Sequence, residues 1–387
     1  MYFQEAEHIT LMRESIRRFL DEEVPLKKMS EWDEMDEIPY SFVEKLGEMG
    51  LGGLTVSESY GGAGSDYYGT IVAIEELARR STAIASLYIM NACYGGMNIS
   101  ACGSEEQKKK LLPQLAEGKI LFSYGLSEPD VGSDLASVRT KAERRGDHIV
   151  VNGIKRWCTG ANVSDYIYCL ARTGDADARY NNLSFLLIPT DSKGVSMTHS
   201  PTLGLRGLAT NDVVFDNVEI GEDSIVGGVE YWNHGWGQLM GSALEVEKIE
   251  VAAMALGVAT QAVEDAWSYA EQRTQFGKKI GAIQSVRHQL AEVKTKLLAT
   301  RLMVYHGAHL AQSEHQIAAE TSMVKNFACE TCVEIVLSCQ KVMGAYGYSK
   351  EFPMERYVRD ILVMPIFGGS TAIHNNNIAK RLFLAEK

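Results

Sequence analysis

The chain has 387 residues, of which 45% are hydrophobic and 23% are charged, as is typical of a globular protein. This length predicts two or three domains, or one large unit with several lobes. The net charge of −12 argues against a protein that coats nucleic acid, because such proteins present a basic face.

The chain divides into three regions by the period of its hydrophobic residues. In residues 1–120 apolar side chains recur every three to four positions, which predicts helices, and Ser104 followed by Gln107 indicates a capping box. In residues 121–232 the period changes to two, in short β-branched and aromatic runs that predict an antiparallel sheet or barrel. Residues 233–387 are helical again, with segments of ~25 residues that predict a bundle packing between subunits.

Seven cysteines occur at irregular spacing, and Cys329, Cys332 and Cys339 form their only cluster. No histidine or cysteine pair completes a tetrahedral set around this cluster, so buried positions on a helix are a better interpretation than a metal or redox motif. We therefore expect no metal. Reduced cysteines and the lack of a signal peptide predict a cytoplasmic protein, and no apolar run approaches the ~20 residues that span a bilayer.

Common nucleotide and metal motifs are absent. No G-x-G-x-x-G motif follows a predicted strand and opens a helix, which argues against a Rossmann dinucleotide site. Neither a Walker A motif nor an H-E-x-x-H motif occurs. Residues that bind a ligand or carry out catalysis must therefore be sought outside these common motifs.

Two stretches could instead hold a flat heteroaromatic ligand: residues 124–142 and 152–166. Ser127 and Thr159 offer hydroxyl groups and Trp157 offers a flat face for stacking. Taken alone, each stretch has a simpler interpretation, with Trp157 in the core of a sheet and residues 132–134 in a turn.

Both stretches resemble the signature regions of the acyl-CoA dehydrogenase family of flavoproteins. The resemblance continues in the family's order through the opening stretch, residues 269–284 (YAEQRTQFGKKIGAIQ) and residues 340–360 (QKVMGAYGYSKEFPMERYVRD). It covers nearly the whole chain and implies an α+β fold: an N-terminal α-helical domain, a middle antiparallel β domain and a C-terminal four-helix bundle. The expected domains are residues 1–120, 121–232 and 233–387.

The resemblance implies FAD as the cofactor and an acyl thioester of coenzyme A, or of an acyl carrier protein, as the substrate. It implies an electron-transfer flavoprotein as the partner and a homotetramer built as a dimer of dimers, with no nucleic acid and no membrane. The reaction implied is α,β-dehydrogenation, in which a carboxylate removes the α-proton of the thioester while the β-hydride moves to flavin N5.

The family's cofactor contacts are carried over where the local motifs match. Four residues would line or flank the flavin ring: Leu126, Ser127, Thr159 and Trp157. Gly132 and Ser133 would lie by the flavin and by the pantetheine arm of the substrate. Arg273 would hold the pyrophosphate through paired charge-assisted bonds, with Phe276 and Gln284 beside the adenosine. Two more residues would come from a neighbouring subunit: Gln340 and Gly344.

A glycine pair precedes a predicted helix in residues 364–382 (MPIFGGSTAIHNNNIAKRL), and glycine permits close backbone approach. In the family this turn crosses between flavin and thioester, which implies that Ser370 contacts the cofactor and that Gly368 and Gly369 contact the substrate. The next residue of this turn that contacts the cofactor in the family is a glutamine, and this chain has Ala372 there. We therefore expect altered binding of the adenosine.

Most family members carry the catalytic glutamate in this turn, where the present chain has Gly368. Its backbone N–H can still polarise the thioester carbonyl, but the side-chain base is lost. A minority, including the isovaleryl-type enzymes, place the base on a helix, and the matching residue in ALEVEKIEVAA is Glu247. Lys248, where the family often has arginine, is expected to orient this helix or tune the base near the substrate. The alternative is that Glu247 is one of several helix-surface acids.

Because Gly368 removes bulk near the α-carbon, a short, branched or functionalised acyl group is the expected substrate. Three other interpretations remain open. One is an enoyl-thioester reductase of the crotonobetainyl-CoA type, and another is a base-less enzyme of elimination or desulfination. The third, a non-catalytic flavin-binding or DNA-associated protein, is disfavoured by the net charge and by the lack of a basic C-terminal extension.

Overall fold

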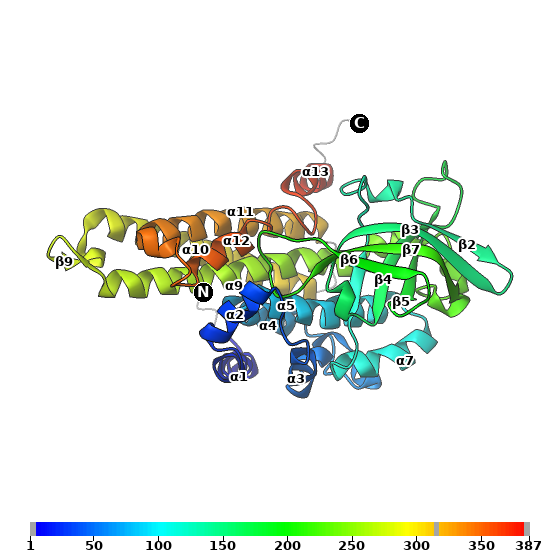
Figure 1. Cartoon of the computed structure of the whole chain (residues 1–387), viewed down its shortest axis with the longest axis horizontal. Coiled ribbons are helices and arrows are strands. Elements are labelled where there is room, and N and C mark those ends of the chain that lie inside the picture. The colour runs from blue at the N-terminus through cyan, green and yellow to red at the C-terminus, as the bar shows by residue number, and fades with distance from the viewer. Residues whose placement is uncertain (1–4, 313–316, 383–387) are drawn as a thin grey trace.

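The computed structural model describes residues 5–312 and 317–382, in which helices enclose one end of a sheet and extend away from it (Figure 1). The extreme ends of the two expected helical domains, residues 1–4 and 383–387, lie outside the described residues. We retain the division at residues 120/121 and 232/233 as a proposal.

The N-terminal region is helical, as the spacing of its apolar residues predicts. Its helices are α1 (Glu7–Glu23), α2 (Leu26–Met35), α3 (Phe42–Glu48), α4 (Tyr67–Arg80), α5 (Thr82–Tyr88), the π-helical segment η3 (Ile89–Met97), α6 (Asn98–Cys102) and α7 (Glu105–Ala116). The capping box of α7 is confirmed, because the Ser104 hydroxyl accepts from the Gln107 N–H at 3.2 Å and the Gln107 side chain accepts from the Ser104 N–H at 2.9 Å. A π-helical segment is rare and is often found at functional sites.

The middle region forms one seven-stranded sheet. Its strands are β1 (Phe122–Gly125), β2 (Lys141–Arg145), β3 (His148–Thr159), β4 (Tyr166–Arg172), β5 (Leu183–Pro189), β6 (Val195–His199) and β7 (Thr210–Gly221). The order is β1-β4-β2-β3-β7-β6, with β5 also paired to β4. Hydrophobic clusters cover both faces of β4 and β5, so these strands are buried throughout rather than alternating.

The sheet differs in one respect from the antiparallel sheet that the sequence predicts. β4 pairs in parallel with β1 and, at one residue, with β2, whereas the other pairings are antiparallel. Parallel neighbours need a long crossover, and residues 126–165, which lie between β1 and β4 and include the β2–β3 hairpin, supply it. The crossover places the loop after β1 beside β3, and both carry residues of the signature stretches.

The C-terminal region contains the long helices that the sequence predicts. Its elements are α8 (Gly235–Leu239), α9 (Ser242–Gln272), the hairpin of β8 (Thr274–Gln275) and β9 (Lys278–Lys279), α10 (Gln284–Gln312), α11 (Ala318–Met343), α12 (Met354–Ile361) and α13 (Thr371–Arg381). The short α12 packs against α9 and α11 and completes a bundle of four helices. Within the described ranges, none of the helices has the length and apolarity that a membrane crossing requires.

Helix α9 is the central element of the molecule. It packs against α4 of the N-terminal region and against α10 and α11, and its first turns also contact η3 and α6. One hydrophobic core therefore joins the N-terminal and C-terminal helices. The sheet lies at the end of α9 where that helix begins, and the β8–β9 hairpin lies at the opposite end (Figure 1).

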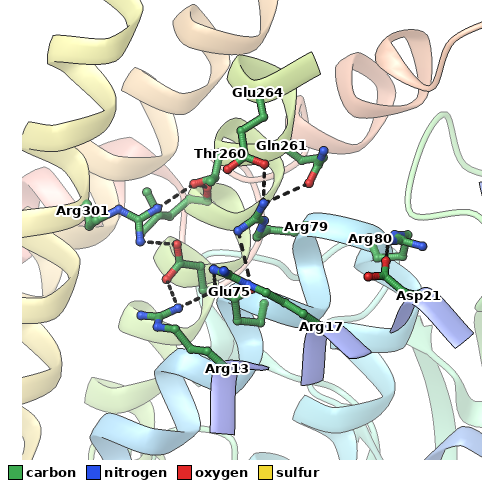
Figure 2. A network of polar contacts seen from close by, with 12 residues as sticks. Arg13, Arg17, Asp21, Glu75, Arg79, Arg80, Thr260, Gln261, Glu264 and Arg301 are labelled. Atoms are coloured by element: carbon green, nitrogen blue, oxygen red, sulfur yellow. Dashed lines mark hydrogen bonds and ion pairs between the residues drawn. The ribbon is translucent and has the colours of Figure 1, made fainter. Parts of the chain in front are cut away.

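A buried ionic network ties α1 and α10 to α4. Arg13 of α1 contacts Glu75 and Glu76 of α4 at 3.1 and 2.6 Å, and Arg301 of α10 contacts Glu75 at 2.6 Å. Figure 2 shows Arg13 and Arg301 converging on Glu75 from two different helices. Both glutamates are almost wholly buried, so their arginine partners offset the cost of removing the carboxylates from water.

Replacing Arg13 by methionine should therefore destabilise the protein by about 3 kcal/mol, because it leaves buried carboxylates short of a partner. We expect a loss of several degrees in melting temperature, measured by circular dichroism. Lys350→Met is the matched control, since Lys350 and its partner Glu34 are both exposed and such pairs contribute about 1 kcal/mol or less. Equal melting temperatures for the two variants would contradict this account.

Candidate active site

Glu247 is buried in the second turn of α9, not displayed on the helix surface. Its side chain is 9% exposed, and it faces a small cavity shared by several elements. The cavity is lined by Asn98, Tyr124, Leu126, Tyr168, Phe185, Gln238, Leu239 and Glu247. Within residues 5–312 and 317–382, no donor forms a hydrogen bond with the Glu247 carboxylate. The interpretation of Glu247 as a surface acid is therefore wrong.

Burial raises the pKa of Glu247 to about 7, against the opposing effect of the positive charges of Lys248 and Lys325. A carboxyl group with a pKa near neutrality is suited to act as a general base. Glu250, one turn further along α9, is also buried, and its pKa rises to about 8 through burial and through the charge of Glu247. Among the described residues no nitrogen or oxygen donor bonds Glu250, and the neighbouring Cys93 thiol, as a hydrogen-bond donor, offsets part of the rise in its pKa.

The glycine turn lies against the same face of α9 as Glu247. Gly368 and Gly369 have φ angles of +60° and +85°, which glycine adopts without the strain of a side chain. A Cβ atom built on Gly368 would lie 3.1 Å from Cγ2 of Val251, and Val251 follows Glu247 by one helical turn. The chain geometry that excludes a side chain at position 368 thus brings the turn close to the carboxylate on the helix.

Two buried side chains hold the turn, and neither was predicted from the sequence. Lys325 of α11 donates to the carbonyl of Gly369 at 2.6 Å, and His374 of α13 bonds the carbonyl of Gly368 through Nε2 at 2.9 Å. Burial lowers the pKa of His374 to about 4, so the ring is neutral and Nε2 carries the proton that it donates. The available signal for Lys325 was its place on the apolar face of a predicted helix, because a charged group buried there requires a partner.

Ser370 and Lys248 have clear local partners. The Ser370 hydroxyl caps α13 by accepting from the N–H of Ile373 at 3.4 Å. Lys248 pairs with Glu245 at 2.7 Å and lies 3.5 Å from Thr321 of α11, so it links α9 to α11 and does not line the cavity. Both roles expected for Lys248 have support: its contacts fit the orientation of the helix, and its positive charge lowers the pKa of Glu247.

The residues expected around the flavin ring lie together at the end of β1 and along β3. Lys155 donates to the carbonyl of Leu126 at 3.0 Å, and the N–H of Arg156 donates to the carbonyl of Ser127 at 2.9 Å. The Ser123 hydroxyl bonds the carbonyl of Thr159 at 2.8 Å. These bonds join the two signature stretches into one surface.

Trp157 is exposed on this surface, and the alternative that it belongs to the sheet core is wrong. Its side chain is 53% exposed, its φ angle is +63°, and the Arg156 guanidinium lies 4.5 Å from its ring centre. Gly132 and Ser133 are exposed in the loop between β1 and β2, where a Cβ atom on Gly132 would meet nothing within 4 Å. The arrangement leaves a flat aromatic face and open space beside it.

A buried ion pair that the sequence did not predict supports this loop. Lys155 contacts Glu128 at 2.9 Å, and the other oxygen of Glu128 accepts from the backbone N–H of Arg139 at 2.7 Å. A lysine at an inward position of a predicted strand requires such a partner, which was the available signal. Through the bond from Lys155 to the Leu126 carbonyl, the pair fixes the backbone at Leu126.

The remaining predicted cofactor residues lie at the opposite end of the bundle: Arg273, Phe276, Gln284, Gln340 and Gly344. Arg273 ends α9, ~39 Å along the helix from Glu247 at 1.5 Å per residue, and its guanidinium lies 5.6 Å from the Tyr346 ring centre. Phe276, at the tip of the β8–β9 hairpin, is 91% exposed. Figure 1 shows the β8–β9 hairpin at the end of the molecule opposite β3, the strand that carries Trp157, so a single chain does not bring the two groups of residues together.

The cysteine cluster has no metal geometry. Cys329, Cys332 and Cys339 are unpaired and buried on α11, as expected for apolar helix positions. Burial raises the pKa of Cys329 to about 12, so its thiol stays protonated. No group of three or more metal ligands occurs in the part of the chain that the structure describes.

Comparison with known proteins agrees with this architecture along the whole chain. The N-terminal, middle and C-terminal domain models of acyl-CoA dehydrogenases match residues 6–119, 123–218 and 233–383, respectively. An acyl-CoA dehydrogenase of Bacillus subtilis is 36% identical over 97% of this chain and 99% of its own length. The caffeyl-CoA reductase-Etf complex subunit CarC of Acetobacterium woodii is 33% identical over 99% of both chains.

The solved structure of glutaryl-coenzyme A dehydrogenase with glutaryl-CoA superposes with a TM-score of 0.93, at 29% identity. The superposition covers 100% of this chain and 98% of the other. With the expected three-part fold and this similarity to enzymes along its full length, the chain belongs to the acyl-CoA dehydrogenase family of FAD-dependent oxidoreductases.

Proposed function

We propose that this protein dehydrogenates the Cα–Cβ bond of an acyl-CoA thioester and that Glu247 removes the α-proton. The observation that carries this proposal is a buried carboxylate with a pKa of about 7, on the face of α9 that meets the glycine turn. Desolvation makes the carboxylate basic enough to accept a proton from carbon near neutral pH.

The residues present fit an FAD. The exposed ring of Trp157, the hydroxyl groups of Ser127 and Thr159, and the open space at Gly132 suit one face of a flat heteroaromatic ring. When bound, FAD supplies the acceptor for the hydride that leaves the β-carbon. Leu126, Ser133 and Ser370 complete the set that would hold the flavin half and the pantetheine arm.

The substrate carbonyl would be polarised by the backbone N–H of Gly368. No carbonyl or side chain among the described residues accepts a hydrogen bond from this N–H, so it is available to a ligand. His374 and Lys325 bond the carbonyls of Gly368 and Gly369 and thereby fix the turn. A donor that is already oriented stabilises the negative charge that develops on the thioester oxygen when Glu247 takes the α-proton.

The second half of the FAD site would come from a neighbouring subunit. Arg273, Phe276, Gln284, Gln340 and Gly344 lie too far from Trp157 to share a cofactor with it in one chain. Four of them are exposed at the far end of the bundle and Gln340 is half-buried, which fits a site completed across a subunit contact. We accordingly propose a homotetramer, in which each flavin contacts two chains.

An electron-transfer flavoprotein is the proposed electron acceptor, because the similar Acetobacterium woodii subunit is named as part of an Etf complex. That relative is a reductase, so the reverse reaction is the second candidate for this chain. All seven cysteines are unpaired thiols, which fits a reducing compartment and supports a cytoplasmic location.

Glu247→Gln should lower the rate of flavin reduction by acyl-CoA roughly 10²- to 10⁴-fold while FAD stays bound, because the amide cannot accept the proton. Anaerobic stopped-flow bleaching of the flavin measures this rate. Glu271→Gln is the control, since Glu271 is an exposed acid at the other end of α9. Full activity of Glu247→Gln would show that Glu247 is not the catalytic base and would favour a reaction without one.

Lys325→Met should move the acid limb of the pH–rate profile to higher pH, by roughly one unit. The base works when ionised, so activity rises through the pKa of Glu247, and loss of the positive charge of Lys325 raises that pKa. His374→Leu is the matched control, because it also releases the turn but removes no charge. Its rate should fall without movement of the limb. A limb that stays in place in Lys325→Met would contradict the electrostatic role.

Mixed oligomers test whether two chains build each site. Arg273→Ala should lose FAD on purification, and Glu247→Gln should keep FAD without activity. Co-expressed, the two inactive chains should regain about one quarter of the wild-type activity. About half of randomly formed dimers are mixed, and in a mixed dimer one of the two sites combines an intact Glu247 from one chain with an intact Arg273 from the other. Mixtures no more active than either variant alone would place each site within a single chain.

A further inference from the structure

The cavity beside Glu247 is small and has a defined polar character. Its volume of about 10 Å³ gives room for about one water molecule. Leu126, Tyr168, Phe185 and Leu239 provide apolar walls, whereas Asn98, Tyr124 and Gln238 provide polar groups. No lysine, arginine or histidine lines the cavity, and its only ionisable carboxyl group is Glu247.

Tyr124 offers this cavity a hydrogen-bond donor. Its hydroxyl oxygen accepts from the Asn98 side chain at 2.6 Å, and the same Asn98 nitrogen donates to the carbonyl of Tyr94 at 3.1 Å. Burial keeps the pKa of Tyr124 well above its ordinary value, so the hydroxyl retains its proton. No acceptor in the described part of the chain takes that proton. The Tyr94 ring stacks on Tyr124 at 3.8 Å and holds it in place.

Gln238 offers a hydrogen-bond acceptor. Its amide nitrogen donates to the carbonyl of Val226 at 2.9 Å, which fixes the orientation of the amide. Its Oε1 atom is buried and has no partner among the described residues. A buried acceptor without a donor costs about 1–3 kcal/mol, so a ligand that supplies a donor here gains that energy.

The cavity presents one hydrogen-bond donor, Tyr124, one acceptor, Gln238, and no cation. These properties determine which chemical group of a substrate can bind there. A hydroxyl group can accept from Tyr124 and donate to Gln238 at the same time. A carboxylate would meet the Gln238 oxygen and the charge of Glu247 without any compensating cation. A methyl group would leave both polar atoms unpaired, and an aromatic ring exceeds the available volume.

We propose that this cavity is a specificity site for a hydroxyl group on the fourth carbon of a short acyl thioester. The proposal rests on the function above, since Glu247 faces the second carbon and the third carbon loses the hydride, so the fourth is the first position open to a stable substituent. Asn98 acts as a positioning residue that orients Tyr124. The substrates in the names of the similar enzymes, caffeyl-CoA and glutaryl-CoA, have a larger and a charged acyl group, respectively. This cavity suits neither group.

Four thioesters test the proposal: 4-hydroxybutanoyl-CoA, pentanoyl-CoA, butanoyl-CoA and succinyl-CoA. The first two have the same size and differ by a hydroxyl in place of a methyl. We expect kcat/KM for 4-hydroxybutanoyl-CoA to exceed that for pentanoyl-CoA at least tenfold, and succinyl-CoA to be the poorest substrate. The dissociation constants of the same thioesters, measured by calorimetry on Glu247→Gln, should follow the same order without turnover.

Two variants assign the preference to the cavity. Tyr124→Phe and Gln238→Met should each reduce the ratio of hydroxylated to methyl substrate to about one. Tyr40→Phe should leave the ratio unchanged, because Tyr40 is exposed and does not line the cavity. A wild-type ratio of one or less, a ratio that survives both variants, or a preference for succinyl-CoA would overturn the inference. Failure of every thioester to reduce the flavin would instead overturn the proposed function.

Discussion

The burial of an unpaired carboxylate at the start of α9 is the constraint on which the rest of this structure depends. Removing a charged group from water costs several kcal/mol unless partners compensate, and Glu247 has no hydrogen-bond donor among the described residues. Two lysines, Lys248 and Lys325, supply positive charge without touching the carboxylate. The pKa of Glu247 is therefore about 7, so the carboxyl group can both lose and accept a proton near neutral pH, as a general base requires.

The packing of α9 stabilises the fold and offsets the free-energy cost of burying Glu247. Helix α9 is buried along most of its length against α4, α10 and α11, so its first turns are held although they carry Glu247 and Glu250 in an apolar setting. The ionic network around Glu75 secures α4, on which α9 rests. A hydrophobic scaffold can thus tolerate two buried acids near its end.

The proposed base and the proposed carbonyl donor come from different elements. Gly368 adopts a backbone angle that disfavours a side chain and lies against Val251, so the turn contributes only its N–H. The acid comes from the helix that touches the turn. Lys325 serves both, because it bonds the turn at Gly369 and lowers the pKa of Glu247 through space. A change at Lys325 therefore reaches both halves of the proposed chemistry.

The sequence by itself determined the three-part fold, because hydrophobic period is a local property: a spacing of three to four marks helices and a spacing of two marks strands. The capping box at Ser104 and the bare Gly368 could be read in the same way, and the resemblance to a family supplied Glu247. Only the tertiary structure decided that Glu247 is buried, that Lys325 and His374 hold the turn, and that Tyr124 and Gln238 face one cavity. It also placed Arg273 at the end of α9 that lies opposite the sheet, whose strand β3 carries Trp157. Burial, charge coupling and distance arise from contacts between segments far apart in the chain, which no local pattern encodes.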